Sequence, residues 1–75
     1  MGKEKEVRFT IDQDYLEALQ DRLGLKKSTD VTRTALTLLE WASTEAANGR
    51  VILSSTEEGK DLHRLVMPEL QRVKG

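Results

Sequence analysis

The stretch VRFTI at residues 7–11 decides how this chain folds, because its apolar and polar residues alternate. Val7, Phe9 and Ile11 share one parity, and the polar residues between them share the other. Three apolar side chains at period two predict a half-buried strand. Nothing after this stretch reads as a hairpin turn that leads to a second long strand. The predicted strand therefore needs a partner from elsewhere.

A first amphipathic helix is expected directly after the strand, at about residues 13–23. Asp12 is a favourable N-cap, and leucines then recur at helical spacing. Gly24 is the residue type that ends helices in a left-handed conformation, and Leu25 can make the accompanying apolar contact.

A second, longer helix is predicted after a short basic loop. Ser28 and Thr29 are both suitable N-caps, and Asp30 is favourable in the first turn. The helix is expected to end near Ala47, because Asn48 and the glycine after it are stop signals.

The remainder, residues 50–75, reads as an appendix of a short strand and a helix. The apolar run at 51–53 is typical of a strand, and Ser55 and Glu58 have capping-box spacing. A weak third helix should follow, with Gly59 inside it and an end or a kink at Met67, before the only proline. The expected apolar face of this helix consists of Leu62, Leu65 and Val66.

The chain is too small to bury a large core alone. It has 75 residues and no cysteine, and a domain of this size buries only about 60% of its unfolded surface. Antiparallel pairing of the strand with the same strand of a second copy would enlarge the core. The expected core of that dimer consists of Val7, Phe9, Ile11, Leu16, Leu19, Val31, Ala35, Leu38, Leu39 and Trp41.

The chain resembles the ribbon-helix-helix family of repressors and antitoxins in the order of these elements and in the alternation of apolar and polar residues along the strand. The resemblance runs from Glu6 to about Gly49 and is carried by VRFTID, DYLEALQDRLGL and KKSTDVTRTALTLLEWA. It implies a mainly α fold with a short N-terminal strand, forming a homodimer through an intermolecular antiparallel two-stranded ribbon. Residues 1–5 would then be a flexible arm, 6–49 the DNA-binding and dimerisation domain, and 50–75 the appendix.

The resemblance also implies where DNA would bind. The ribbon of such proteins enters the major groove of double-stranded DNA, where each base pair presents a distinct pattern of donors and acceptors. Its base-reading positions fall here on Glu6, Arg8 and Thr10. Phosphates would lie at the N-terminus of the second helix, and the basic arm could reach the DNA backbone. The expected phosphate contacts are Lys3, Lys5, Lys26, Lys27, Ser28 and Thr29.

Composition excludes several other classes of function. The net charge is −1, so the composition does not indicate the strongly basic surface that is typical of nucleic-acid-binding proteins. We find no nucleophile–base pair, glycine-rich phosphate loop or metal constellation, so we expect no enzyme, no metal and no cofactor. His63 is expected to be a surface residue. No apolar run is long enough to span a membrane, and Met1 to Lys5 lacks the apolar segment of a secretory signal, so the cytoplasm is the expected compartment.

Two functions therefore stay open. The first is a sequence-specific transcriptional regulator, acting as a repressor. The alternative is an antitoxin or adaptor whose residues 50–70 cover a protein partner such as a toxin. The same appendix could instead fold back on its own dimer.

Overall fold

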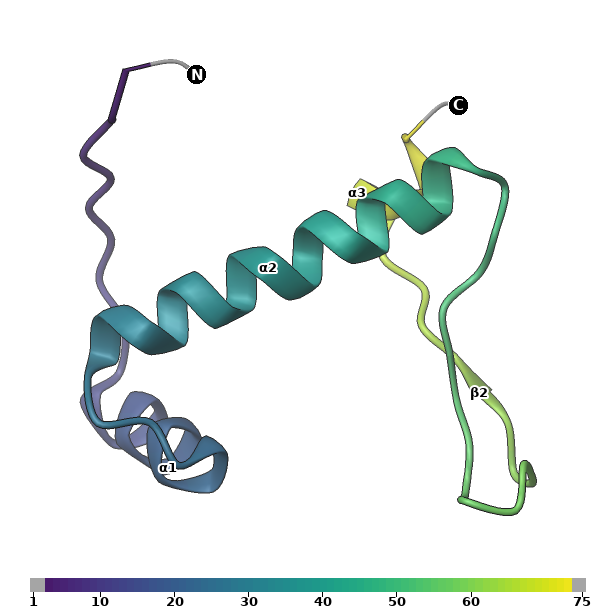
Figure 1. Ribbon diagram of the computed structural model, residues 1–75, viewed down its shortest axis with the longest axis horizontal. Helices are drawn as coiled ribbons and strands as arrows, with labels where there is room; N and C mark the ends of the chain where they lie inside the picture. Colours follow the sequence, from purple (N-terminus) through teal and green to yellow (C-terminus); the bar gives the residue numbers. More distant parts are fainter. Residues whose placement is uncertain (1–2, 74–75) are drawn as a thin grey trace. The chain divides into compact units, whose positions relative to one another are not determined.

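The computed structural model describes residues 3–73, which form three helices and one two-stranded sheet. The elements in chain order are α1 (Gln13–Leu23), α2 (Ser28–Ala47), β1 (Leu53–Ser54), β2 (His63–Arg64) and α3 (Pro68–Gln71), shown in Figure 1. The chain divides into two units, residues 1–32 and 33–75, and the boundary lies within α2.

Helix α1 has the predicted ends. The Asp12 carboxylate accepts a hydrogen bond from the Tyr15 backbone N–H at 2.9 Å, which satisfies a donor that the helix itself leaves free. Gly24 adopts a φ of 70°, and the N–H of Leu25 donates to the Gln20 carbonyl at 3.0 Å. This pattern closes the helix in the way that a left-handed glycine allows.

Helix α2 also has nearly the predicted extent. Ser28 is its first helical residue, one position earlier than a cap at Ser28 would place the start. Asp30 lies in the first turn, where its charge is favourable to the helix dipole. At the other end, the Arg50 backbone N–H donates to the Glu45 carbonyl at 3.0 Å, and its guanidinium pairs with the Glu45 carboxylate at 2.9 Å.

The prediction of a third helix in this region is wrong, because this part of the chain forms a β-hairpin. Strands β1 and β2 pair antiparallel, with Leu53 opposite Arg64 and Ser54 opposite His63. The Leu65 N–H extends the ladder by donating to the Ile52 carbonyl at 2.8 Å. The residues assigned to the helix face, Leu62, Leu65 and Val66, therefore lie beside the second strand.

Positive backbone angles explain why a hairpin forms where a helix was expected. Gly59 has a φ of 79° and Asp61 a φ of 55°, and neither angle fits a right-handed helix. The Thr56 N–H donates to the Lys60 carbonyl at 2.9 Å, and the Thr56 hydroxyl accepts from the Lys60 N–H at 3.1 Å. These bonds close the turn, so Gly59 serves the turn and is not an isolated glycine inside a helix.

Pro68 begins a helix and does not end one. Met67 is extended, with φ −132° and ψ 130°, as steric contact with a following proline favours. Pro68 then occupies the first turn of α3, where its missing N–H costs no hydrogen bond. The appendix is thus a hairpin followed by one helical turn.

The structure assigns no strand to the predicted segment 7–11 in the single chain. No backbone hydrogen bond in the described part of the chain involves residues 3–11. A strand is defined by pairing with another strand, and no other segment of residues 3–73 pairs with this one. The two-stranded sheet lies in the hairpin instead.

Few side chains are buried in either unit. Val31 is the buried apolar residue of residues 3–32, where Leu16 and Leu19 are half-buried. Ala42 and Leu70 are buried in residues 33–73, and Leu70 lines a groove together with Leu36 and Leu39 of α2 and other residues.

Candidate nucleic-acid interface

Two of the proposed base-reading side chains, those of Glu6 and Arg8, contact each other. The Arg8 Nη2 lies 3.3 Å from both carboxylate oxygens of Glu6. Side chains two residues apart do not face each other on a helix, whereas they share a face in an extended chain. The Glu6–Arg8 contact therefore agrees with the period-two pattern of this segment.

This ion pair leaves both groups accessible to a ligand. The side chains of Arg8 and Glu6 are 84% and 75% exposed, and Thr10 on the same parity is exposed as well. An exposed pair of this kind contributes little stability, since water solvates both charges. Arg8 can thus exchange the carboxylate for another acceptor at small cost, while Glu6 adds negative charge beside it.

The apolar side chains of the same segment are also exposed. Val7, Phe9 and Ile11 are 69%, 62% and 39% exposed in the single chain. Large apolar side chains gathered on a surface mark an interaction site.

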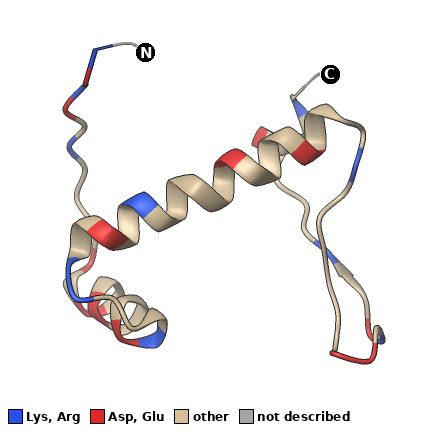
Figure 2. Cartoon of the chain, in the orientation of Figure 1, with Lys and Arg blue, Asp and Glu red and all other residues tan. Residues whose placement is uncertain are grey.

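The second expected contact region is the start of α2. Lys26, Lys27, Ser28 and Thr29 are all exposed. Figure 2 shows positive charge in the loop that precedes α2, followed by negative charge in its first turn. The helix N-terminus favours an anion through its free N–H groups and its dipole, whereas Asp30 already supplies one negative charge there.

Other predicted contact residues lie apart along the chain. Lys3 and Lys5 of the expected arm are exposed, and Met1 and Gly2 lie outside the described residues.

Of the expected dimer core, Val31 is buried, and Leu16 and Leu19 are half-buried. The remaining α2 members are exposed, namely Ala35, Leu38, Leu39 and Trp41.

Residues 3–73 contain no group of three metal-ligating side chains. His63 is exposed and lies 3.2 Å from the Asp61 carboxylate. Within the same residues, no helix has the length and apolar character needed to cross a membrane.

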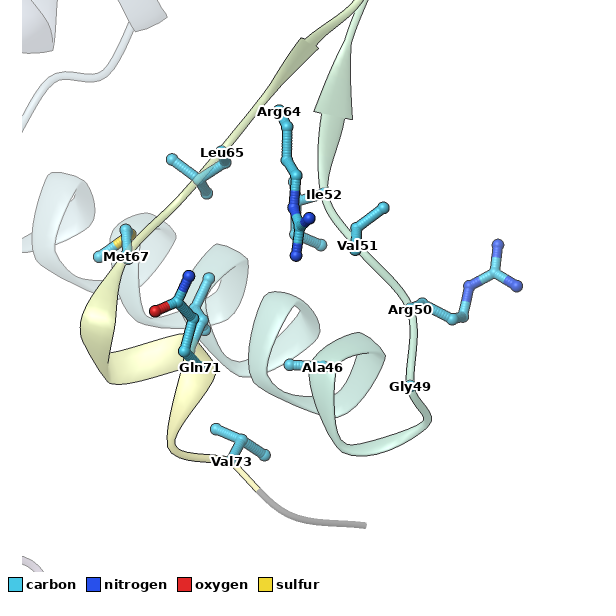
Figure 3. Close-up of a pocket in the computed structure, with 11 residues that line it drawn as sticks. Ala46, Gly49, Arg50, Val51, Ile52, Arg64, Leu65, Met67, Gln71 and Val73 are labelled. Carbon is cyan, nitrogen blue, oxygen red and sulfur yellow. The ribbon is translucent and has the colours of Figure 1, made fainter.

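Sequence reasoning missed a cavity in the C-terminal unit. This cavity has a volume of about 270 Å³ and is lined by the end of α2, the hairpin and α3, as Figure 3 shows. Arg50 and Arg64 are its charged lining residues among those described. No local signal could reveal it, because the cavity depends on a hairpin that the sequence pattern does not distinguish from a helix.

Comparisons with known proteins give no independent assignment. No protein-family model, no curated protein and no solved structure matches this chain.

Proposed function

We propose that the chain is a sequence-specific double-stranded DNA-binding regulator that acts as a homodimer. The observation that carries the proposal is the segment 6–11, in which polar and apolar residues alternate, Glu6 contacts Arg8, and the backbone makes no hydrogen bond within the described chain. Antiparallel pairing of two copies would satisfy its backbone groups and cover Val7, Phe9 and Ile11.

The same pairing would present the polar parity of both copies on one outer face. Glu6, Arg8 and Thr10 of each copy would then line a two-stranded ribbon of the kind that the major groove admits. The Arg8 guanidinium suits the two acceptors of a guanine edge, Thr10 suits several bases, and Glu6 suits the amino group of cytosine. The start of α2 would hold phosphates, which fixes position without reading sequence.

Selection from a random-sequence duplex library tests this function without knowledge of the regulated gene. We expect the purified protein to enrich a short site with two-fold symmetry, since two identical ribbons read related half-sites. Binding to that site should resist unrelated duplex and weaken with salt, because phosphate contacts release counterions. Enrichment no greater than that obtained with the Arg8→Ala variant would contradict the proposal.

A second candidate function is favoured by the exposed apolar side chains of the hairpin region. Residues 50–70 expose Val51, Leu53, Leu62, Leu65 and Val66, and such a surface is typical of protein-binding sites. An antitoxin or adaptor would use it to cover a protein partner. A Leu62→Ser/Val66→Ser variant that still selects the DNA site but no longer retains the product of a neighbouring gene would favour this function. Retention of that product at wild-type level would contradict it.

A further inference from the structure

The cavity of the C-terminal unit is lined by apolar and polar groups in equal measure. It lies between residues of the last turn of α2, both sides of the hairpin and the segment around α3 (Figure 3). Its volume of about 270 Å³ is just below the range found for ligand pockets, about 300–1,000 Å³. The apolar side chains that line it include Ile52, Leu65, Met67, Leu70 and Val73.

The charge on the cavity wall is entirely basic among the described residues. Arg50 and Arg64 are its charged lining side chains, and no acidic residue lines it. Arg50 is neutralised by Glu45 at 2.9 Å, and Figure 3 shows its guanidinium directed away from the other lining residues.

Arg64 differs from Arg50 in its ion pairing and in the direction of its guanidinium. Figure 3 shows its guanidinium extending among the lining residues. No ion pair of Arg64 occurs among residues 3–73. A guanidinium carries five N–H donors in a planar fork that matches a carboxylate with two parallel hydrogen bonds.

We propose that this cavity binds a small amphiphilic carboxylate. The carboxylate would pair with Arg64, and an apolar body would pack on Ile52, Leu65 and Leu70. The apolar half of the lining favours an organic acid over inorganic phosphate, since a compact dianion would leave it in contact with water. Every lining residue lies between 46 and 73, so the site is separate from the residues proposed to contact DNA.

A titration followed by amide chemical shifts tests the site in the full-length protein. The probes are octanoate, octanamide, octylammonium and acetate, which separate the carboxylate from the apolar body. We expect saturable shifts at the lining residues with octanoate, and affinities at least about tenfold weaker for the other three. Octanamide and octylammonium lose the charge-assisted contact to Arg64, whereas acetate keeps that contact but lacks the apolar body.

Two matched variants assign the binding to Arg64. Arg64→Gln and Arg72→Gln each remove one exposed positive charge, but Arg72 does not line the cavity. Octanoate binding should weaken about tenfold in Arg64→Gln and stay within about twofold of wild type in Arg72→Gln. Arg64→Lys, which keeps the charge without the fork, should give an intermediate affinity.

Three results would overturn the proposal. The first is equal affinity for octanoate and octanamide, because the carboxylate would then contribute nothing. The second is equal weakening in Arg64→Gln and Arg72→Gln, which indicates a general effect of charge. The third is absence of saturable shifts at the lining residues, including the case in which octanoate perturbs residues 7–11 instead. None of these results bears on DNA binding.

Discussion

Arg8 combines a strong binding group with a weak contact to Glu6. The guanidinium lies 3.3 Å from the Glu6 carboxylate, and both side chains are largely exposed. Substitution of Arg8 therefore has little to remove from the fold itself, whereas a bidentate contact to guanine discriminates bases by about 1–3 kcal/mol.

We accordingly expect Arg8→Ala to weaken binding to the selected duplex by about tenfold or more, with the unfolding midpoint unchanged. Fluorescence anisotropy and thermal unfolding give the two readouts. Arg22→Ala is the matched control, since it removes an exposed arginine from α1 and should leave the affinity within about twofold. Equal losses in the two variants would mean that Arg8 contributes only general charge.

Asp12 is the N-cap residue of α1, and removal of its side chain should lower the free energy of unfolding. The carboxylate accepts the Tyr15 N–H at 2.9 Å, and loss of such a cap destabilises by about 1 kcal/mol. We expect Asp12→Ala to lower the free energy of unfolding by about that amount in urea titrations followed by circular dichroism. Asp14→Ala removes a nearby first-turn charge without removing the cap, and its smaller effect provides the comparison.

At the scale of elements, the two long helices could be predicted because their signals are local. The Asp12 side chain, the leucine spacing and the left-handed Gly24 all lie within α1 or next to it. The hairpin could not be predicted in this way. Leu62, Leu65 and Val66 fit the spacing of a helix face, and the choice against a helix is made by the Thr56–Lys60 bonds across the turn.

The candidate sites also differ in whether the local sequence predicts them. The shared parity of Glu6 and Arg8 follows from their spacing, and their contact agrees with it. The cavity around Arg64 joins residues from α2, the hairpin and α3. Such a site depends on tertiary packing, so the pattern of nearby residues does not indicate it.

The turn of the hairpin offers a test in which two neighbouring substitutions have different signs. Gly59 has a φ of 79°, and a Cβ added there would meet nothing within 4 Å. Gly59→Ala should therefore destabilise through backbone strain alone, by about 1–2 kcal/mol. Asp61, with a φ of 55°, already carries that strain, so Asp61→Gly should be neutral or slightly stabilising.

Urea unfolding of both variants measures these effects, with the hairpin followed by amide exchange. A loss of stability in Asp61→Gly as large as that in Gly59→Ala would contradict the strain argument. It would mean instead that the Asp61–His63 contact at 3.2 Å holds the turn.

At the scale of the whole molecule, apolar surface greatly exceeds apolar core. Within residues 3–73 the buried apolar residues are Val31, Ala42 and Leu70, whereas fourteen large apolar side chains are exposed. A folded monomer in water rarely leaves so much apolar surface uncovered. Association with a second copy would remove part of this surface and stabilise the fold by mass action.

The unfolding midpoint should therefore rise with protein concentration, and sedimentation should report a dimer. Phe9→Ala should weaken the dimer by several kcal/mol, since truncation of a buried Phe costs about 3–5 kcal/mol. Thr10→Ala changes the opposite parity of the same segment and should leave self-association unchanged. A midpoint independent of concentration, together with an unaltered Phe9→Ala dimer, would exclude the proposed ribbon.

The extended segment before α1 also determines how the chain meets proteases. Lys3, Lys5 and Arg8 lie on exposed backbone without hydrogen-bonded partners in the described chain, which is the state in which a trypsin-like enzyme takes up its substrate. Pairing into a ribbon would close that access at Arg8. If the ribbon forms, the rate of cleavage at this arginine would report the fraction of unassociated chain, and inside a cell the same cut would remove residues 1–8 selectively from copies that have not yet found a partner.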